Sequence, residues 1–250
     1  MNTKIGVFDS GIGGVTVLKE CLNLCPNYEY IYYSDSKNNP YGEKTKEKII
    51  EYSDANTKQL IKLGCKIIII ACNTASTTSV NYLRNKYKNI SFIAIEPAIK
   101  LAYDNTINEG CLIMATPGTL NSDKFKELFN KYHKENFYLL PCDGLAALIE
   151  NNKQKEIIKY LKTKLEPYKN KISSIVLGCT HYPLIKKEIN KILPNITFYD
   201  GSIGVANNLK RIIKEENYIE TTQNVIFIDT LNDINKENRF YELVKEERYE

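Results

Sequence analysis

The feature that most constrains the fold of this chain is a run of four isoleucines at residues 67–70, followed by Ala71 and Cys72. Short apolar runs rich in β-branched residues are typical of strands that are buried on both faces, as in a parallel sheet. Small and polar residues begin directly after the run, and they favour the start of a helix. Cys72 is therefore expected where the carboxyl end of a strand meets a helix N-terminus, the edge at which open α/β sheets bind ligands.

The same pattern occurs a second time around Cys179. Residues 173–178 form another short apolar run, and the cysteine is followed by polar residues and by a segment compatible with a helix. The two cysteines lie 179 − 72 = 107 positions apart. Their matching contexts indicate two related half-sites.

Apolar runs alternate with segments of helical periodicity along nearly the whole chain. Strands are predicted at residues 4–8, 28–33, 67–71, 91–95, 111–115, 136–140, 173–178, 196–199 and 224–228. This alternation predicts an α/β fold of mainly parallel sheets flanked by helices. These strands are too many for one small sheet, so we expect two domains. The first would comprise residues 1–97 plus 208–250 and the second residues 98–207. A cleft between them would let both cysteines face one ligand.

Two segments near the predicted sheet edges carry more specific expectations. The glycine-rich turn at residues 9–14 lacks the spacing of a nucleotide-binding loop. Either its glycines supply the positive φ of a tight turn, or Asp9 and Ser10 lie as polar groups at the same edge as Cys72. Residues 145–165 are expected to form one helix, and residues 116–119 a small polar loop.

Composition excludes several classes of function. Lys and Arg exceed Asp and Glu by only 34 − 30 = 4, and they are scattered, so nucleic acid is not an expected partner. No apolar stretch approaches the ~20 residues that span a bilayer, and the N-terminus begins in a strand without a signal peptide. We therefore expect a cytoplasmic protein with no membrane partner. Its seven cysteines are then free thiols, and without zinc-like spacing near His133 or His181 no metal site is expected.

Two thiols suit acid–base chemistry on opposite faces of one carbon. The ordinary pKa of a thiol, about 8.5, makes both protonation states accessible near neutral pH. One thiolate would remove a proton from a stereocentre while the other thiol delivers a proton to the opposite face, which inverts the carbon with no cofactor. Asp9 is the candidate proton partner of Cys72, and His181 with Glu150 that of Cys179.

Hydroxyl and amide groups near the two cysteines suit the carboxylate and ammonium of an amino acid. The candidates are Ser10, Asn73, Thr74, Thr116, Thr119 and Thr180. Each has an ordinary alternative, because a cysteine after a buried strand is often an inert core residue and a threonine there often only caps a helix. The repeated context of the cysteines favours the functional interpretation of that pair. Packing roles are expected for the others, Cys21, Cys25, Cys65, Cys111 and Cys142.

Five motifs carry a resemblance to a known family. They are Asp9-Ser-Gly-Ile-Gly-Gly-Val-Thr-Val17, Pro40-Tyr-Gly42, Ala71-Cys-Asn-Thr-Ala75, Thr116-Pro-Gly-Thr119 and Leu177-Gly-Cys-Thr-His-Tyr-Pro-Leu184. In their order and spacing, from residue 4 to about residue 210, they resemble bacterial glutamate racemases of the aspartate/glutamate racemase family. The combination of the two cysteine motifs is the most specific part of this likeness.

The resemblance implies a fold and an activity. It implies two pseudosymmetric α/β domains with the active site in the interdomain cleft, commonly in a homodimer. The activity would be interconversion of L- and D-glutamate without cofactor or metal, supplying D-glutamate for peptidoglycan.

The resemblance also implies roles for single residues. Cys72, assisted by Asp9, would handle the proton of D-glutamate, and Cys179, assisted by His181 and Glu150, that of L-glutamate. Substrate would be bound by Ser10, Pro40, Tyr41, Gly42, Asn73, Thr74, Thr116, Thr119 and Thr180. The chain departs from the family pattern at residues 142–144, shortly before Glu150.

Three alternatives remain open from the sequence. The same scaffold could racemise aspartate or another acidic amino acid. A thiol hydrolase or lyase would need one cysteine only and would form a covalent intermediate. A regulatory protein on this scaffold would bind glutamate without exchanging its α-hydrogen.

Overall fold

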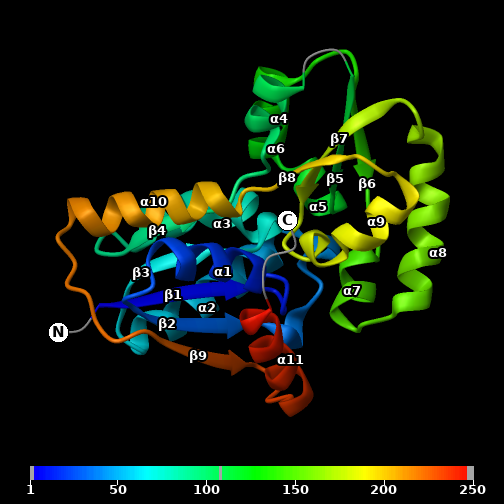
Figure 1. Cartoon of the computed structure of the whole chain (residues 1–250). Coiled ribbons are helices and arrows are strands. Elements are labelled where there is room, and N and C mark those ends of the chain that lie inside the picture. Colours follow the sequence, from blue (N-terminus) through cyan, green and yellow to red (C-terminus); the bar gives the residue numbers. More distant parts are fainter. Residues whose placement is uncertain (1–2, 107–108, 247–250) are drawn as a thin grey trace.

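In the computed structural model, which describes residues 3–106 and 109–246, the strands form two separate sheets in which all neighbouring strands are parallel (Figure 1). The first sheet has the order β4-β3-β1-β2-β9. Its strands are β1 (Lys4–Asp9), β2 (Glu29–Ser34), β3 (Cys65–Ile70), β4 (Ser91–Ala94) and β9 (Asn224–Asp229). The second sheet has the order β6-β5-β7-β8. Its strands are β5 (Gly110–Ala115), β6 (Phe137–Pro141), β7 (Ile172–Gly178) and β8 (Thr197–Tyr199). The predicted α/β class with two parallel sheets is confirmed.

The two sheets share one topology. Read from its other edge, the second sheet has the order β8-β7-β5-β6, which repeats β4-β3-β1-β2 with every strand number raised by four. In this correspondence β3 matches β7, and one of the two cysteines that the sequence singled out lies within two residues of the end of each strand. The matching sequence contexts of Cys72 and Cys179 therefore reflect equivalent places in a repeated fold. Among the strands of residues 3–106 and 109–246, β9 alone lies outside the repeat.

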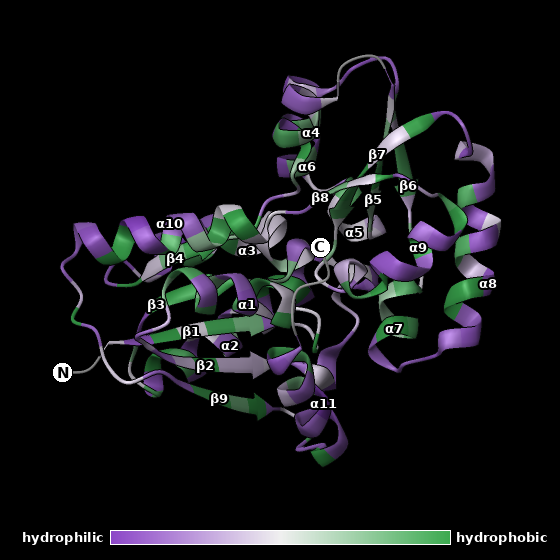
Figure 2. Cartoon of the chain, in the orientation of Figure 1, coloured by the Kyte–Doolittle hydropathy of each residue, from purple (hydrophilic) through white to green (hydrophobic). Residues whose placement is uncertain are grey.

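The isoleucine strand is buried on both faces, as expected. Ile67 and Ile69 pack in a core that includes residues of α1 (Val15–Leu24) and α10 (Ser202–Glu215). Ile68 and Ile70 point to the opposite face, into a core with residues of α2 (Lys46–Lys62) and α3 (Asn73–Lys86). Figure 2 shows the result, with hydrophobic residues in the central strands and a mixture of hydrophilic and hydrophobic residues on the outer helices α8 and α10.

The second sheet is covered in the same way. One face packs against α7 (Leu145–Glu150), α8 (Gln154–Leu165) and α9 (Lys186–Ile192), and the other against α4 (Ile99–Asn105) and α6 (Asp123–Tyr132). Short helical turns complete the chain: η1 (Ser36–Asn38), η2 (Tyr41–Glu43), η3 (Glu166–Tyr168), η4 (Tyr182–Ile185) and α5 (Pro117–Asn121). The half-buried Leu184 packs against the cores of both sheets and so joins the two halves.

Two local predictions were wrong. The single helix expected at residues 145–165 is two helices, because the chain turns after Glu150 and Asn152 adopts a φ of 52°, a left-handed conformation that asparagine tolerates. Glu150 is therefore the last residue of α7. The polar loop expected at residues 116–119 is the N-terminal part of α5, with Thr116 as the cap that accepts a hydrogen bond from the Thr119 amide.

The last part of the chain returns to the first sheet. Val205, Ala206 and Leu209 of α10 pack in the core beside α1, and β9 pairs with β2. The division proposed between residues 207 and 208 therefore falls inside α10. The final helix, α11 (Ile234–Lys245), lies beyond the carboxyl end of β9 (Figure 1).

None of the helices within residues 3–106 and 109–246 combines the length and the apolar character that crossing a membrane requires.

Phe240 fixes α11 to the first sheet, and its removal gives a test of this packing. Its ring is fully buried and lies 4.4 Å from that of Phe227 and 4.8 Å from that of Tyr32, between ring centroids. We expect Phe240→Ala to lower the free energy of unfolding by about 3–5 kcal/mol, measured by urea denaturation. Ile219→Ala, at a side chain that is 72% exposed, should change it by less than about 0.5 kcal/mol. Equal effects of the two substitutions would contradict the packing described.

Candidate functional site

The strand order changes direction at one point in each sheet, and the predicted site residues follow the strands at those points. In the first sheet the change lies between β1 and β3, which end at Asp9 and just before Cys72. In the second it lies between β5 and β7, which end just before Thr116 and Cys179. Ligands of open α/β sheets bind at such points. Here the two edges face each other, because side chains of one sheet bond directly to those of the other.

Asp9 and Thr180 make one of these contacts across the two halves. Asp9 is fully buried, and its Oδ2 accepts hydrogen bonds from the Gly14 amide at 2.8 Å and from Thr180 Oγ1 at 3.1 Å. Thr16 Oγ1 adds a bond to the Thr180 carbonyl at 3.2 Å. Burial raises the pKa of Asp9, while the charge of His181 opposes this rise. Asp9 can therefore hold or release a proton closer to neutral pH than an exposed aspartate.

Cys72 lies at the N-terminus of α3 and beside Ser10. Its side chain is buried, and its sulfur is 3.8 Å from Ser10 Oγ. Burial raises the pKa of the Cys72 thiol, and the charges of Asp9 and Cys179 raise it further. The thiol is therefore the resting form of Cys72, and Asp9 and Cys179 are near enough to influence it.

Cys179 has a different neighbour, the imidazole of His181. The sulfur lies 3.8 Å from Nδ1, and Nε2 on the other side of the ring lies 2.6 Å from Glu150 Oε2. Burial alone would lower the pKa of His181, but its contacts with Cys179 and Glu150 raise it well above 6.5. The imidazolium form is thus favoured beside the sulfur.

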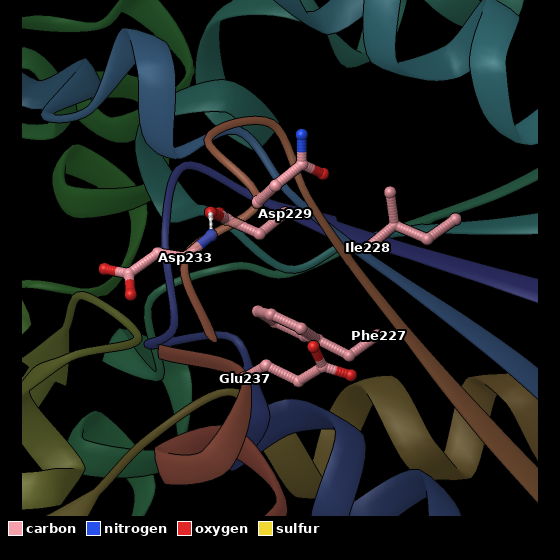
Figure 3. Close-up of a pocket in the computed structure, with 6 residues that line it drawn as sticks. Phe227, Ile228, Asp229, Asp233 and Glu237 are labelled. Carbon is pink, nitrogen blue, oxygen red and sulfur yellow. Dashed lines mark hydrogen bonds between the residues drawn. The ribbon is translucent and has the colours of Figure 1, made fainter. Parts of the chain in front are cut away.

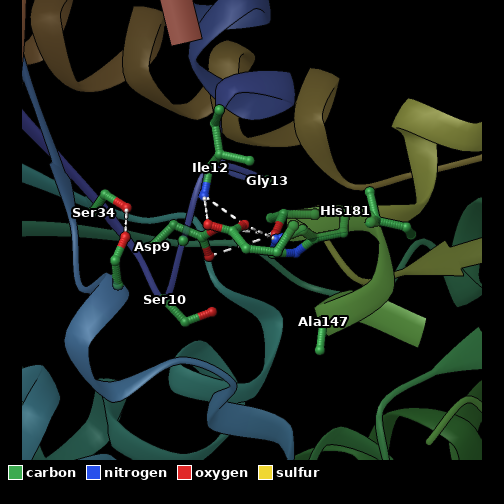
Figure 4. Close-up of polar contacts among 12 residues, drawn as sticks. Asp9, Ser10, Ile12, Gly13, Ser34, Ala147 and His181 are labelled. Carbon is green, nitrogen blue, oxygen red and sulfur yellow. Dashed lines mark hydrogen bonds and ion pairs between the residues drawn. The ribbon is translucent and has the colours of Figure 1, made fainter. Parts of the chain in front are cut away.

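Glu150 joins this pair to the glycine-rich turn. Its carboxylate accepts a hydrogen bond from the Ile12 amide at 3.0 Å. Figure 4 shows Ile12 close to Asp9 and His181. Burial would raise the pKa of Glu150, but the hydrogen bond and charge of His181, together with Lys236, lower it to about 2. Glu150 is therefore a fixed anion that orients His181.

The glycines of this turn are needed for close approach and not for positive φ. Within the described part of the chain, only Gly64 and Gly144 among the glycines have positive φ, so that explanation was wrong. A Cβ on Gly13 would lie 2.5 Å from His181 Nδ1, and one on Gly11 would lie 2.5 Å from Glu150 Oε2. The turn lets His181 and Glu150 of one half approach the backbone of the other closely.

A cluster of threonines forms a second bridge between the halves. Thr74 Oγ1 lies 2.9 Å from Thr116 Oγ1 and 3.2 Å from Thr119 Oγ1. Gly42 lies against Thr116, since a Cβ there would be 2.7 Å from Thr116 Cβ. These predicted residues are brought together by the fold.

Asn73 and Tyr41 differ in whether the polar atoms of their side chains have hydrogen-bond partners in the protein. Both polar atoms of the buried Asn73 amide lack a protein partner in the structure, and Asn73 directly follows Cys72. The hydroxyl of Tyr41, by contrast, donates to Asp35 at 2.5 Å and accepts from Asn56 at 3.0 Å. The Tyr41 side chain is thus fixed in the core, so only its backbone and the flanking Pro40 and Gly42 remain to meet a ligand.

Sequence reasoning missed two basic residues of the C-terminal helix. Lys236 Nζ lies 2.7 Å from Glu150 Oε1, and Arg239 donates to the carbonyls of Glu150 and Ile149 at 2.6 and 3.0 Å. No local signal marks them, because α11 reads as an ordinary charged surface helix. Only the return of the chain to the first sheet brings them to α7.

A separate pocket of about 250 Å³ lies along β9 and the start of α11 (Figure 3). It contains none of the predicted site residues, being lined by Phe227, Ile228, Asp229, Asn232, Asp233 and Glu237. In the described part of the chain no group of three or more His, Cys, Asp or Glu side chains has the arrangement of a metal site.

Comparison with known proteins agrees with this geometry. A family model described as Asp/Glu/Hydantoin racemase matches residues 5–206. The chain belongs to this family. A glutamate racemase of Clostridium perfringens is 43% identical over 249 residues, which cover 98% of this chain and 95% of that protein.

Solved structures of the same family are also similar. The glutamate racemase of Francisella tularensis, in complex with D-glutamate, has a TM-score of 0.82 and 30% identity, covering 98% of this chain and 95% of that one. The enzyme of Escherichia coli, in complex with L-glutamate and the activator UDP-MurNAc-Ala, has a TM-score of 0.86 and 28% identity, covering 96% of each chain. The resemblance stated from the motifs is confirmed.

The low pKa of Glu150 predicts a specific acid dependence. A carboxylate whose pKa falls from an ordinary 4.5 to about 2 on folding contributes stability above pH 4.5 that is lost as pH falls through about 2. Glu150→Gln should therefore be less stable than the wild type at neutral pH, and the difference should shrink between pH 4.5 and 2. Urea denaturation at a series of pH values measures it. Glu166→Gln, at an exposed side chain, should show no such trend; a constant difference for Glu150→Gln would refute the assignment.

Proposed function

We propose that the protein is a glutamate racemase that interconverts L- and D-glutamate with two cysteines, Cys72 and Cys179, and without a cofactor. The observation that carries the proposal is the topological repeat, in which each cysteine lies within two residues of the end of equivalent strands at facing sheet edges. Support also comes from the family membership and from relatives solved with L-glutamate and with D-glutamate. The product D-glutamate would serve peptidoglycan synthesis.

The surroundings of the two sulfurs indicate which acts first on each enantiomer. His181 favours its protonated form beside Cys179, an arrangement that suits a thiolate–imidazolium pair. Cys72 is favoured as a thiol, because burial and Asp9 oppose its ionisation. For L-glutamate we assign the role of acid to Cys72 and the role of base to Cys179, the cysteine to which the resemblance assigns this enantiomer.

The reaction then balances without another reactant. The Cys179 thiolate removes the α-proton of L-glutamate, and the Cys72 thiol gives a proton to the opposite face of the same carbon. The products are D-glutamate, a Cys179 thiol and a Cys72 thiolate. Asp9 can then protonate the Cys72 thiolate, and Cys179 can pass its proton to His181 once the imidazolium has released its own proton to solvent. The reverse reaction exchanges the two roles.

The substrate's polar groups have suitable partners in the same space. The unpartnered amide of Asn73 and the hydroxyls of Ser10, Thr74 and Thr180 offer donors and acceptors for a carboxylate and an ammonium group. The N-terminus of α3, which begins at Asn73, favours an anionic group. Cytoplasmic location and a homodimer stay predictions, which cell fractionation and light scattering would test.

Serine substitutions at the two cysteines test the mechanism. We expect Cys72→Ser and Cys179→Ser each to lower kcat for racemisation by at least about a hundredfold, because a hydroxyl is a far weaker acid than a thiol. Circular dichroism of L- and D-glutamate and of both aspartate enantiomers measures rate and specificity. Cys25→Ser, at a cysteine distant in sequence from both motifs, is the control and should keep full activity.

Deuterium exchange in D₂O separates the proposal from its rivals. Cys72→Ser should exchange the α-hydrogen of L-glutamate through Cys179 faster than it inverts the carbon. A single essential cysteine with a covalent adduct in mass spectrometry would instead show a hydrolase or lyase. Glutamate binding without any exchange in the wild type would show a binding protein, and faster turnover of aspartate would correct the substrate.

A further inference from the structure

The C-terminal helix α11 reaches the candidate site through one lysine. Lys236 Nζ lies 2.7 Å from Glu150 Oε1 and donates to Ser36 Oγ at 2.7 Å, and its side chain is only 14% exposed. The contact joins three elements that are distant in sequence: α7, the turn after β2, and α11. A lysine is rarely buried to this extent without a specific partner.

The first turn of α11 holds Lys236 in place. Asp233 caps the helix by accepting from the amides of Asn235 and Lys236 at 2.9 and 3.4 Å. Asp229 in turn accepts from the amides of Leu231 and Asp233, both at 3.2 Å. Asp229 and Asp233, two of the acidic residues of the pocket in Figure 3, thus fix the start of this helix. The hydrogen-bonded first turn of α11 therefore places Lys236 beside Glu150.

Both oxygens of the Glu150 carboxylate are occupied. Oε2 faces His181 at 2.6 Å and the Ile12 amide at 3.0 Å, and Oε1 faces Lys236 at 2.7 Å and the same amide at 3.3 Å. Without Lys236, Oε1 would keep only the longer, shared bond of an amide. A buried anion that loses a cationic partner is left undercompensated. The His181 side chain would then have to compensate the negative charge of Glu150 without the help of Lys236.

We propose that Lys236 is a positioning residue for the reaction, which keeps Glu150 ionised and shares its charge so that His181 can exchange protons with the Cys179 sulfur and with solvent. An imidazole bound to an unshared buried carboxylate would hold its proton too tightly for this exchange. Arg239 has a different part, since it bonds only to backbone carbonyls at the end of α7. The inference rests on the proposed two-cysteine mechanism.

The charged groups around His181 come from several elements, and their sum decides its titration. Glu150 and Cys179 favour the imidazolium. Asp9 also interacts with His181, and Lys236 and Arg239 interact with Glu150 from α11. Removing the charge of Lys236 takes away a cation and leaves every anion in place. His181 must therefore bind its proton more strongly in its absence.

Three variants test the proposal: Lys236→Met, Lys236→Arg, and Lys245→Met as a control at an exposed lysine of the same helix. The chain contains only two histidines, His133 and His181, so ¹⁵N-histidine labelling gives a simple NMR titration of each variant. We expect Lys236→Met to move the His181 titration to higher pH by about one unit. Lys236→Arg and Lys245→Met should match the wild type, and the exposed His133 should titrate alike in all four proteins.

Kinetics give the second measurement. In Lys236→Met the limb of the kcat/KM profile that follows His181 should move by the same amount, with kcat near neutral pH lower by about tenfold. A Lys236→Met protein that is less stable or less active but has an unchanged His181 titration would show a purely structural role and overturn the proposal. The titration does not depend on turnover, so it stands apart from the cysteine variants that test the racemase mechanism.

Discussion

The contact between Glu150 and His181, made against the backbone at Ile12, is the interaction on which the rest of the site depends. It belongs to the second half of the molecule but closes on the glycine-rich turn of the first. The contact brings the two sheet edges together and sets the charge beside Cys179. A Cβ on Gly11 or Gly13 would clash with the Glu150 carboxylate or the His181 ring and would displace it. The contact between the halves and the charge beside Cys179 thus depend on the same few atoms.

The repeat makes two half-sites of one design, yet their chemistry differs. Cys72 has a carboxylic partner, Asp9, and Cys179 has an imidazole held by a carboxylate. Burial and Asp9 favour a neutral thiol at Cys72, whereas Cys179 and Glu150 favour the imidazolium form of His181. In the proposed mechanism these unlike neighbours let one sulfur act as the acid and the other as the base, with the roles exchanged for the other enantiomer.

Much of the fold was predictable because it depends on local pattern. The isoleucine run, the similar apolar run before Cys179 and the alternation of strands and helices are patterns that a few neighbouring residues define. The break after Glu150 was missed, because residues 145–165 keep helical periodicity through a turn that only the φ of Asn152 reveals. The site residues on the two cysteine motifs were predictable for the same reason. The φ explanation for the glycines failed because their true constraint is His181 and Glu150, which arrive from the other half of the chain.

The positions of Lys236 and Arg239 at the site could not be predicted from local sequence pattern. Arg239 meets Glu150 across 89 positions of sequence, and only the pairing of β9 with β2 brings them near. Charges on a helix face are usually solvated surface, so composition gives no reason to place these two at a buried carboxylate.

The route of the chain has a consequence for its synthesis on the ribosome. The strands of the second sheet are contiguous, whereas the first sheet lacks its edge strand β9 and its covering helix α10 until the last part of the chain emerges. The second half can therefore complete its core co-translationally, while the first half waits with an uncovered face of apolar strands. An early stop in translation would leave an aggregation-prone sheet beside a finished one.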